Sequence, residues 1–322
     1  MRRRAVAILV TSILATALSG PAQAANEITF GATSNTAFNL AHYVATEKKY
    51  YEAESLKVEA VVVGAAAGVL QQLAAGSLNV AQVATDQSLR AILRGAPIRI
   101  VAGAASNAPF RLVAAKGIRS WSDLRHRMIS VGGLTDVTLY FLRVMARNNG
   151  LADRDYDLLY GGATPNRFAQ LASGAVAAAI LTNPVDFAAL EQGYVDLGSL
   201  QQYLPNWAQN NIVTDTRWAA QHRAVLVAFL RARIKATRYI YEPANRNEII
   251  DVLMRYTRIP QPAAAATYDL YIERRVIARD AGLFEDGIRA NFDALIAMGD
   301  LAEPPPLAGF IDASFLAEAT AR

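Results

Sequence analysis

The stretch from residue 27 to residue 84 reads EITFGATSNTAFNLAHYVATEKKYYEAESLKVEAVVVGAAAGVLQQLAAGSLNVAQVA. Short runs with strand-like alternation in it are separated by longer runs with helical periodicity. The predicted order is strand, helix, strand, helix and strand, over residues 27–32, 38–49, 57–63, 66–75 and 78–83. Strands and helices that alternate at this spacing form right-handed βαβ units on a parallel sheet. The stretch therefore predicts an α/β fold.

The alternation continues through a helix over 87–93 and a strand over 98–104, and a second run of the same kind follows. In the second run we expect strands over 111–115, 128–131, 157–160, 177–181 and 195–197, with helices over 137–148, 167–172 and 185–192. From Arg217 onward the pattern is helical, with one apolar stripe formed by Val225, Phe229, Ala232, Ala236 and Ile240. Two arrangements fit: two consecutive domains with a helical cap, or two lobes between which the chain crosses and returns.

Composition excludes several classes of function. The chain has 322 residues, of which 53% are hydrophobic and 19% charged, so it is long and apolar enough for real cores. It contains no cysteine. Disulfide scaffolds, thiolate metal sites and cysteine nucleophiles are therefore excluded.

The first 24 residues predict a cleaved secretory signal peptide. Three arginines at positions 2–4 precede an apolar run over 5–18 and the small-residue site Ala22-Gln23-Ala24. Without this segment the formal charge of +4 loses three arginines and becomes +1, which gives no reason to expect nucleic-acid binding. The alternative is an uncleaved membrane anchor. We expect a periplasmic protein of a double-membraned bacterium.

Seven polar loops follow predicted strands, which is where open α/β sheets bind ligands. They lie at 34–36, 64–66, 85–87, 106–107, 132–136, 161–164 and 182–184, and each precedes a predicted helix or a crossing. Free N–H groups at helix starts attract carboxylate, sulfonate or phosphate groups. The alternative for each loop is an ordinary helix cap, because Ser, Thr, Asp and Asn favour that position.

Four further side chains are candidates for the ligand site. Arg111 begins the expected crossing strand and has the planar fork that suits an anion, with a surface ion pair as the alternative. Phe38, Phe110 and Trp207 lie near the polar loops and are candidates to stack on a ligand, with core packing as the alternative.

Motifs for cofactors and catalysis are missing from the sequence. The glycine pairs at 132–133 and 161–162 match neither the phosphate-loop nor the dinucleotide pattern. His42, His126 and His222 have no partner at metal-ligand spacing, and no hydrolase motif is present. We expect no cofactor, no metal and no catalytic set.

The sequence resembles substrate-binding proteins of ABC importers of the nitrate, sulfonate and taurine type, a group that includes binders of the thiamine pyrimidine precursor. The residues that carry the resemblance are Ile28-Thr29-Phe30-Gly31 with Thr36-Ala37-Phe38, then Lys48-Lys49-Tyr50-Tyr51, Val63-Gly64, the run QQLAAGSLNVA over 71–81, and Trp121-Ser122-Asp123-Leu124 before Ile129-Ser130-Val131. The match is clearest in the first half of the chain and weakest after Arg217.

The resemblance implies a two-lobed periplasmic-binding-protein fold of type II, with ligand held between lobes that close about a hinge. Crossings would lie near 109–112 and 210–215. Lobe one would comprise residues 25–108 and 213–322, with the C-terminal helices on it, and lobe two residues 109–212. Residues expected to contact the ligand are Ser34, Asn35, Thr36, Phe38, Ala65, Ala66, Asp86, Asn107, Arg111, Thr135, Asp136 and Asn183.

The expected function is capture of a small organic molecule and its delivery to an ABC importer, meaning a permease with its ATPase, by a monomeric receptor. The acidic residues Asp86, Asp136 and Asp186 fall on loops expected to face the cleft. A ligand with a hydrogen-bond donor or an amine, or a neutral heterocycle, is therefore an alternative to an anion. Two alternatives remain. One is an enzyme on the same fold acting on a small heterocycle or organic acid, although sulfinate desulfinases of this fold rely on a cysteine. The other is a ligand-sensing partner of a signalling receptor.

Overall fold

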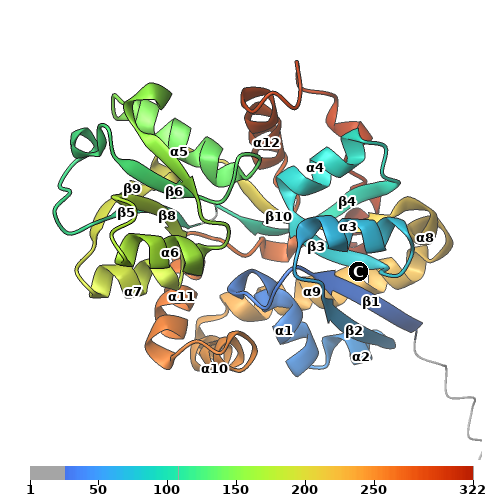
Figure 1. Cartoon of the computed structure of the whole chain (residues 1–322). Coiled ribbons are helices and arrows are strands. Elements are labelled where there is room, and N and C mark those ends of the chain that lie inside the picture. Colours follow the sequence, from blue (N-terminus) through green and yellow to red (C-terminus); the bar gives the residue numbers. More distant parts are fainter. Residues whose placement is uncertain (1–25, 108, 322) are drawn as a thin grey trace, which may run out of the picture.

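The computed structural model describes residues 26–107 and 109–321, which fold into two lobes (Figure 1). Each lobe is built on one five-stranded sheet. The first sheet has the order β2-β1-β3-β10-β4, with β1 Asn26–Ala32, β2 Leu56–Val62, β3 Val80–Ala84, β4 Ile98–Ser106 and β10 Ala208–Asp215. The second has the order β7-β6-β8-β5-β9, with β5 Phe110–Ala114, β6 Met128–Val131, β7 Asp157–Tyr160, β8 Ala178–Thr182 and β9 Val195–Ser199.

Helices cover both faces of each sheet. The helices that precede β10 in the chain are α1 Leu40–Glu47, α2 Tyr50–Ala53, α3 Ala66–Ala74, α4 Thr85–Leu93, α5 Val137–Asn148, α6 Thr164–Ala172 and α7 Val185–Glu191. Those that follow the second sheet are α8 Thr216–Gln221, α9 Arg223–Tyr241, α10 Arg246–Thr257, α11 Gln261–Glu273, α12 Glu285–Ala297 and α13 Ser314–Thr320. No helix of the described residues is both long and apolar enough to cross a bilayer.

The α/β class is confirmed, but the sheets are mixed rather than parallel. β1 runs parallel to β2 and β3, and β6 runs parallel to β7 and β8. β10 is antiparallel to β3 and β4, and β5 is antiparallel to β8 and β9. The reason is that β5 and β10 are the strands that arrive from the other sheet. Each of these two strands starts at the side of the sheet where the carboxyl ends of the parallel strands lie. It therefore runs in the direction opposite to theirs.

The apolar cores lie between the sheets and their helices. One face of the first sheet packs on α1, α9, α10 and α11 around Phe30, Phe229 and Tyr271, and the other face packs on α3, α4 and α12 around Val69 and Phe292. The second sheet has α5 on one face and α6 and α7 on the other. The predicted stripe on α9 is confirmed, because its residues from Phe229 to Ile240 are buried and Val225 packs against the same core. The C-terminal helices therefore belong to the first lobe.

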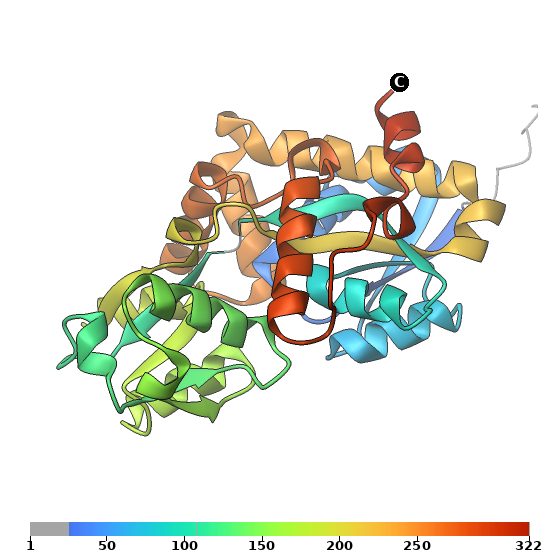
Figure 2. The ribbon, with the colours of Figure 1, turned by 90° about the horizontal axis from the view of Figure 1, so that it is seen from above.

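The chain passes from the first sheet to the second between β4 and β5, and it returns between β9 and β10. Helix α12 lies beside this connection, packed against β10 and α4 and touching α5 of the second lobe (Figure 2). A Cβ atom at Gly287 would lie 2.5 Å from the Ala208 nitrogen, so only glycine permits this approach. Asn291 Nδ2 donates to the Ala208 carbonyl at 3.0 Å. Because β10 starts at residue 208, we propose that the second lobe ends near residue 207 rather than 212.

Candidate functional site

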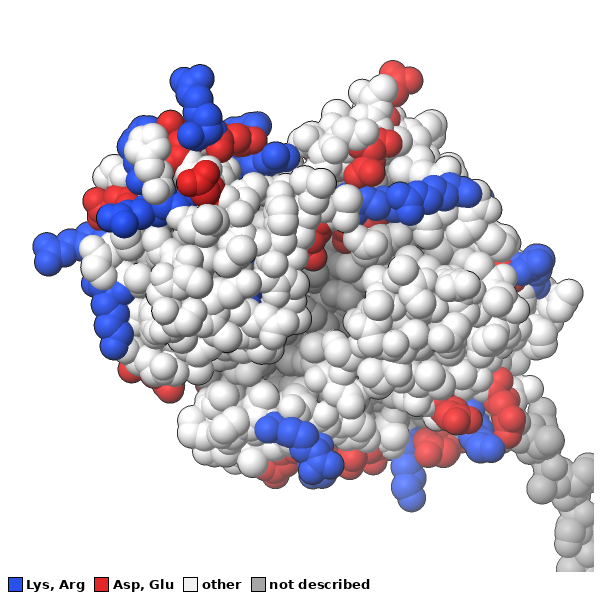
Figure 3. Space-filling view, viewed as in Figure 1, with Lys and Arg blue, Asp and Glu red and all other residues white. Residues whose placement is uncertain are grey.

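A cavity of about 670 Å³ lies between the lobes. It is lined by the loop after β1, the ends of β3 and β8, the first turns of α3, α4, α5 and α6, and the start of β10. In Figure 3 it is visible as the hollow between the two lobes, and most of the surface around it is uncharged. The sequence explains why the surface around the cavity has few charges. Residues 60–85 include no Asp, Glu, Lys or Arg, and Arg167 is the one such residue from 158 to 185.

The structure brings seven of the twelve predicted site residues to this cavity. They are Ser34, Thr36, Phe38, Ala66, Asp86, Asp136 and Asn183. The other five do not line it: Asn35, Ala65, Asn107, Arg111 and Thr135. Asn35, Ala65 and Thr135 are exposed next to lining residues. Phe110 also lines the cavity, whereas Trp207 is buried with its ring edge-on to Phe141 at 4.9 Å.

Asn107 and Arg111 have other contacts. Asn107 has a φ of 49° in the first crossing, and its backbone N–H donates to the Trp207 carbonyl of the returning segment at 2.7 Å. Arg111 Nε donates to Asp186 at 3.3 Å, and its Nη1 donates to Asp196. Arg111 thus links β5 to α7 and β9 by ion pairs. This is the alternative to anion binding that the sequence had left open for it.

The acidic residues that argued against an anionic ligand are engaged within their own lobes. Asp86 is 3% exposed and accepts from Arg90 Nη1 and Gln87 Nε2, each at 2.7 Å. Burial raises the pKa of Asp86 to about 6, although the Arg90 charge opposes the rise. Burial likewise raises the pKa of Asp186, against the opposing charge of Arg111. Asp136 caps α5 by accepting from the Thr138 N–H at 2.9 Å.

Three other helices start at the cavity without a side-chain cap. Their N-cap residues are Ala65 for α3, Ala84 for α4 and Ala163 for α6, and an alanine side chain cannot accept a hydrogen bond. The first-turn N–H groups of α3 and α4 therefore lack the usual side-chain partner and carry the positive end of each helix dipole. In α6 this leaves the Thr164 N–H, because Pro165 has none and the Asn166 N–H donates to the Ala163 carbonyl at 3.0 Å. An anionic or acceptor-rich ligand group would satisfy them.

Arg167, on α6, adds a positive charge to the second lobe's wall of the cavity. Its side chain is 4% exposed and donates to the Ile180 carbonyl at 2.7 Å, to Thr164 Oγ1 at 2.8 Å and to the Gly162 carbonyl. All three acceptors are neutral. Burial lowers the pKa of Arg167 to about 10, with the Asp136 charge opposing, so the guanidinium is charged at neutral pH.

Two buried amide atoms at the cavity have no partner among the described residues. They are Asn183 Nδ2, at the end of β8, and Asn210 Oδ1, on β10. A buried polar atom without a partner costs about 1–3 kcal/mol. Both residues line the cavity, but the two atoms themselves are enclosed by protein, so a ligand would reach them only after the side chains or the lobes move.

Sequence reasoning did not single out Arg167, Gln82 or Asn210. Arg167 had one usable signal, since it is the lone charge in a long uncharged segment. Gln82 and Asn210 lie in strands, and the face on which a polar strand residue projects depends on register that the sequence alone does not give.

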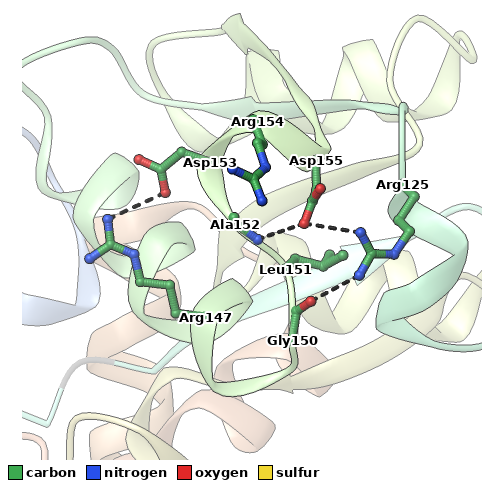
Figure 4. A pocket seen from close by; sticks show the side chains of 8 residues that line it. All are labelled: Arg125, Arg147, Gly150, Leu151, Ala152, Asp153, Arg154 and Asp155. Carbon is green, nitrogen blue, oxygen red and sulfur yellow. Dashed lines mark hydrogen bonds and ion pairs between the residues drawn. The ribbon is translucent and has the colours of Figure 1, made fainter.

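A second hollow of about 760 Å³ opens on the outer surface of the second lobe (Figure 4). We call it the arginine hollow; it is lined by Arg125, Arg147, Gly150, Leu151, Ala152, Asp153, Arg154 and Asp155. Arg125 Nη1 lies 3.0 Å from Asp155, and Arg147 Nη2 lies 3.5 Å from Asp153. Asp155 also accepts from the Ala152 N–H at 2.8 Å. Two of the three arginines are thus paired within this surface, whereas Arg154 is exposed to solvent and is in no ion pair among the described residues. We base no ligand proposal on this hollow.

The geometry can be compared with solved structures. The periplasmic aliphatic sulphonate binding protein SsuA from Escherichia coli superposes with a TM-score of 0.70 at 19% identity, covering 90% of this chain and 92% of that one. The periplasmic nitrate-binding protein NrtA from Synechocystis PCC 6803 gives 0.73 at 13%, covering 91% and 88%. A cysteine-to-serine mutant of DszB in complex with biphenyl-2-sulfinic acid gives 0.71 at 13%, covering 92% and 99%. These identities establish the fold alone.

No curated protein sequence matches this chain significantly. The family described as "NMT1/THI5 like" matches residues 38–246, which is more than half of the chain and includes both walls of the cavity. The chain therefore belongs to the NMT1/THI5-like family.

Proposed function

We propose that this protein is an extracytoplasmic solute-binding receptor, which captures a small organic molecule between its lobes and delivers it to an ABC importer. The observation that carries the proposal is the cavity itself: three uncapped helix starts, a buried guanidinium and two unpartnered amide atoms converge on it from both lobes. SsuA and NrtA, which share the fold, are named for solutes that they bind.

The cavity best fits a ligand with a negatively charged or acceptor-rich group. Such a group would lie at the starts of α4 and α6, near Arg167. If lobe closure turns the enclosed amides of Asn183 and Asn210 toward the ligand, the Asn183 N–H would donate to it and Asn210 Oδ1 would accept from a donor on it. A volume of about 670 Å³ is sufficient for a small organic molecule rather than only for an inorganic ion.

Binding would proceed by closure of the lobes about the two crossing segments. The closed form buries the ligand and aligns the two walls, and the permease would recognise that shape. The ligand shifts the population toward the closed form only by its extra contacts in that form, so both walls must contribute.

The proposed setting is the periplasm, where the protein would act as a monomer with the permease and ATPase of the importer as partners. The expected signal peptide, residues 1–24, lies outside the described residues. We propose no catalytic activity. The cysteine replaced in the DszB mutant has no counterpart here, because this chain contains none.

A thermal-shift screen of the mature protein tests the function. The panel comprises alkanesulfonates, nitrate, aromatic acids, pyrimidines, amino acids and polyamines. A ligand at about 100 times its Kd adds about 2.7 kcal/mol to the free energy of unfolding, which raises the Tm by several degrees. Shifts confined to anionic members would support the proposed ligand class. Shifts confined to polyamines would contradict that class but not the receptor function.

A further inference from the structure

Arg233 is a second buried guanidinium, beneath the first lobe's wall of the cavity. It lies on α9 with 1% of its surface exposed, and its Nη2 donates to Gln82 Oε1 at 2.9 Å. Its Nε and Nη1 have no hydrogen-bond partner, and within the described residues no carboxylate lies at ion-pair distance from it. Besides Gln82, its favourable neighbours are the neutral side chain of Tyr51 and the face of Phe30, 5.8 Å from the guanidinium carbon.

The groups around Arg233 provide no compensating charge. Burial, assisted by the Arg233 charge, lowers the pKa of His42 to about 3, so this imidazole is neutral. Burial raises the pKa of Tyr51 to about 12, so its hydroxyl, 3.1 Å from His42 Nδ1, is neutral as well. Burial lowers the pKa of Arg233 too, but an arginine starts above 12 and keeps its proton in proteins. An unpaired charge at such a depth destabilises the folded protein, because nothing replaces the hydration that it loses.

Gln82 connects this charge to the cavity. It lies in β3 and lines the cavity wall, while its Nε2 donates to the Phe38 carbonyl at 2.7 Å. Because a guanidinium has only donors, it fixes the amide oxygen of Gln82 toward α9. The amide nitrogen is thereby left on the side of the Phe38 carbonyl, and that carbonyl is the one acceptor found for it among the described residues. Gln82 is 2% exposed, so its second N–H would meet a ligand only at the inner wall of the cavity.

We propose that Arg233 is a positioning residue that makes Gln82 a hydrogen-bond donor to the bound ligand, and that its uncompensated charge selects ligands with negative or acceptor groups. The proposal rests on the proposed function. The first wall would then meet the ligand with a polarised amide, and the second wall with the guanidinium of Arg167. Arg233 acts through Gln82 and does not touch the ligand.

Two substitutions test the proposal, because they separate stability from affinity. Gln82→Glu places a carboxylate against Arg233 and replaces the donor to the Phe38 carbonyl by an oxygen. We expect the new ion pair to outweigh that lost hydrogen bond, so that the free protein gains about 2 °C or more in Tm. Arg233→Met removes the charge at similar length, and the Tm of the free protein should not fall. With ethanesulfonate and nitrate as probes, we expect affinity to fall about 100-fold for Gln82→Glu and about tenfold for Arg233→Met.

Arg231→Met is the matched control on the same helix, because Arg231 pairs with Glu54 at 2.8 Å away from the cavity. It should leave affinity unchanged. Arg233→Lys keeps a donor and a charge, and it should recover part of the affinity lost in Arg233→Met. A merely structural Arg233 would lower Tm and affinity together in Arg233→Met.

A fall in Tm for both Gln82→Glu and Arg233→Met would overturn the inference that the Arg233 charge is uncompensated. Unchanged ligand affinity in both variants would overturn the positioning role of Arg233. Wild-type protein that binds neither probe would count against the proposed ligand class. The Tm comparison in free protein would still decide whether the Arg233 charge is uncompensated.

Discussion

The cavity between the lobes and the arginine hollow are similar in size, about 670 and 760 Å³, but they differ in how their charges are used. In the arginine hollow, Arg125 and Arg147 pair with acidic residues of the same surface. In the cavity, Arg167 donates only to neutral oxygens, and two amide atoms are left without partners among the described residues. Hydrogen-bonding capacity that is not used within the protein, rather than volume, is therefore the basis on which we propose the cavity as the ligand site.

The largest expected loss of ligand affinity follows from substitution of Arg167. Arg167→Met removes the buried charge from the cavity, and we expect the affinity for an anionic ligand to fall about 100-fold, because truncating a buried charge in a binding contact costs about 2–5 kcal/mol. Titration calorimetry measures the change. Arg147→Met in the arginine hollow is the matched control and should leave the Kd unchanged. Equal losses in both variants would remove the distinction between the two sites.

The second effect is on the uncapped start of α6. Ala163 is an exposed N-cap with extended backbone, and Ala163→Asp should raise the free energy of unfolding by about 0.5 kcal/mol, the low end for a cap. The gain is small because Pro165 has no N–H to donate and the Asn166 N–H already donates to the Ala163 carbonyl. The same carboxylate would occupy the anion position, and the affinity for an anion should fall about tenfold or more. Ala163→Ser caps without charge and should cost less affinity at a similar gain in stability. Denaturant unfolding and calorimetry measure the two quantities; an affinity unchanged in both variants would exclude α6 from the site.

The third effect concerns pH. Because the pKa of Asp86 is raised to about 6, its carboxylate is charged above that pH and repels an anion. The affinity for an anionic ligand should therefore rise a few-fold as the pH falls from about 7.5 to about 5. The free energy of unfolding changes in the same direction. The Asp86 carboxyl binds its proton more tightly in the folded protein than in the unfolded chain, so its contribution to stability falls as the pH rises from about 4 to about 6. Asp86→Asn should flatten both profiles across this window, and identical profiles for this variant and the wild-type protein would contradict the assignment.

The smallest expected effect is in the arginine hollow. Asp153→Asn breaks half-exposed ion pairs with Arg143, at 2.9 Å, and Arg147, at 3.5 Å. Exposed pairs contribute about 0–1 kcal/mol, so the free energy of unfolding should change by less than about 1 kcal/mol. Ligand affinity should not change. A loss of affinity would mean that this surface is coupled to the cavity.

The sequence predicted the elements that carry their own local signals. Helix α5 has the predicted bounds, because Asp136 caps its start and Gly150 follows its end. The two-lobed fold is confirmed, and SsuA and NrtA share it. β10 was expected only as a crossing, because its sequence AQNNIVTD lacks a regular apolar alternation.

The charges of the site could not be paired from sequence. Arg111 and Asp186 are 75 residues apart, and Gln82 and Arg233 are 151 apart, so only the folded chain brings them together. Long-range contacts of this kind decide whether an acidic side chain faces a ligand or an arginine. For the same reason, the sequence left the charge of the ligand open.

The position of β10 has a consequence for the order in which the protein assembles. β3 and β4 do not pair with each other; β10 lies between them and pairs with both. The ribosome makes β10 only after every strand of the second sheet, so the first sheet stays divided until most of the chain exists. Pairings between such distant segments form slowly. A chain cut short before residue 208 would leave β3 and β4 with open edges, which is a template for aggregation.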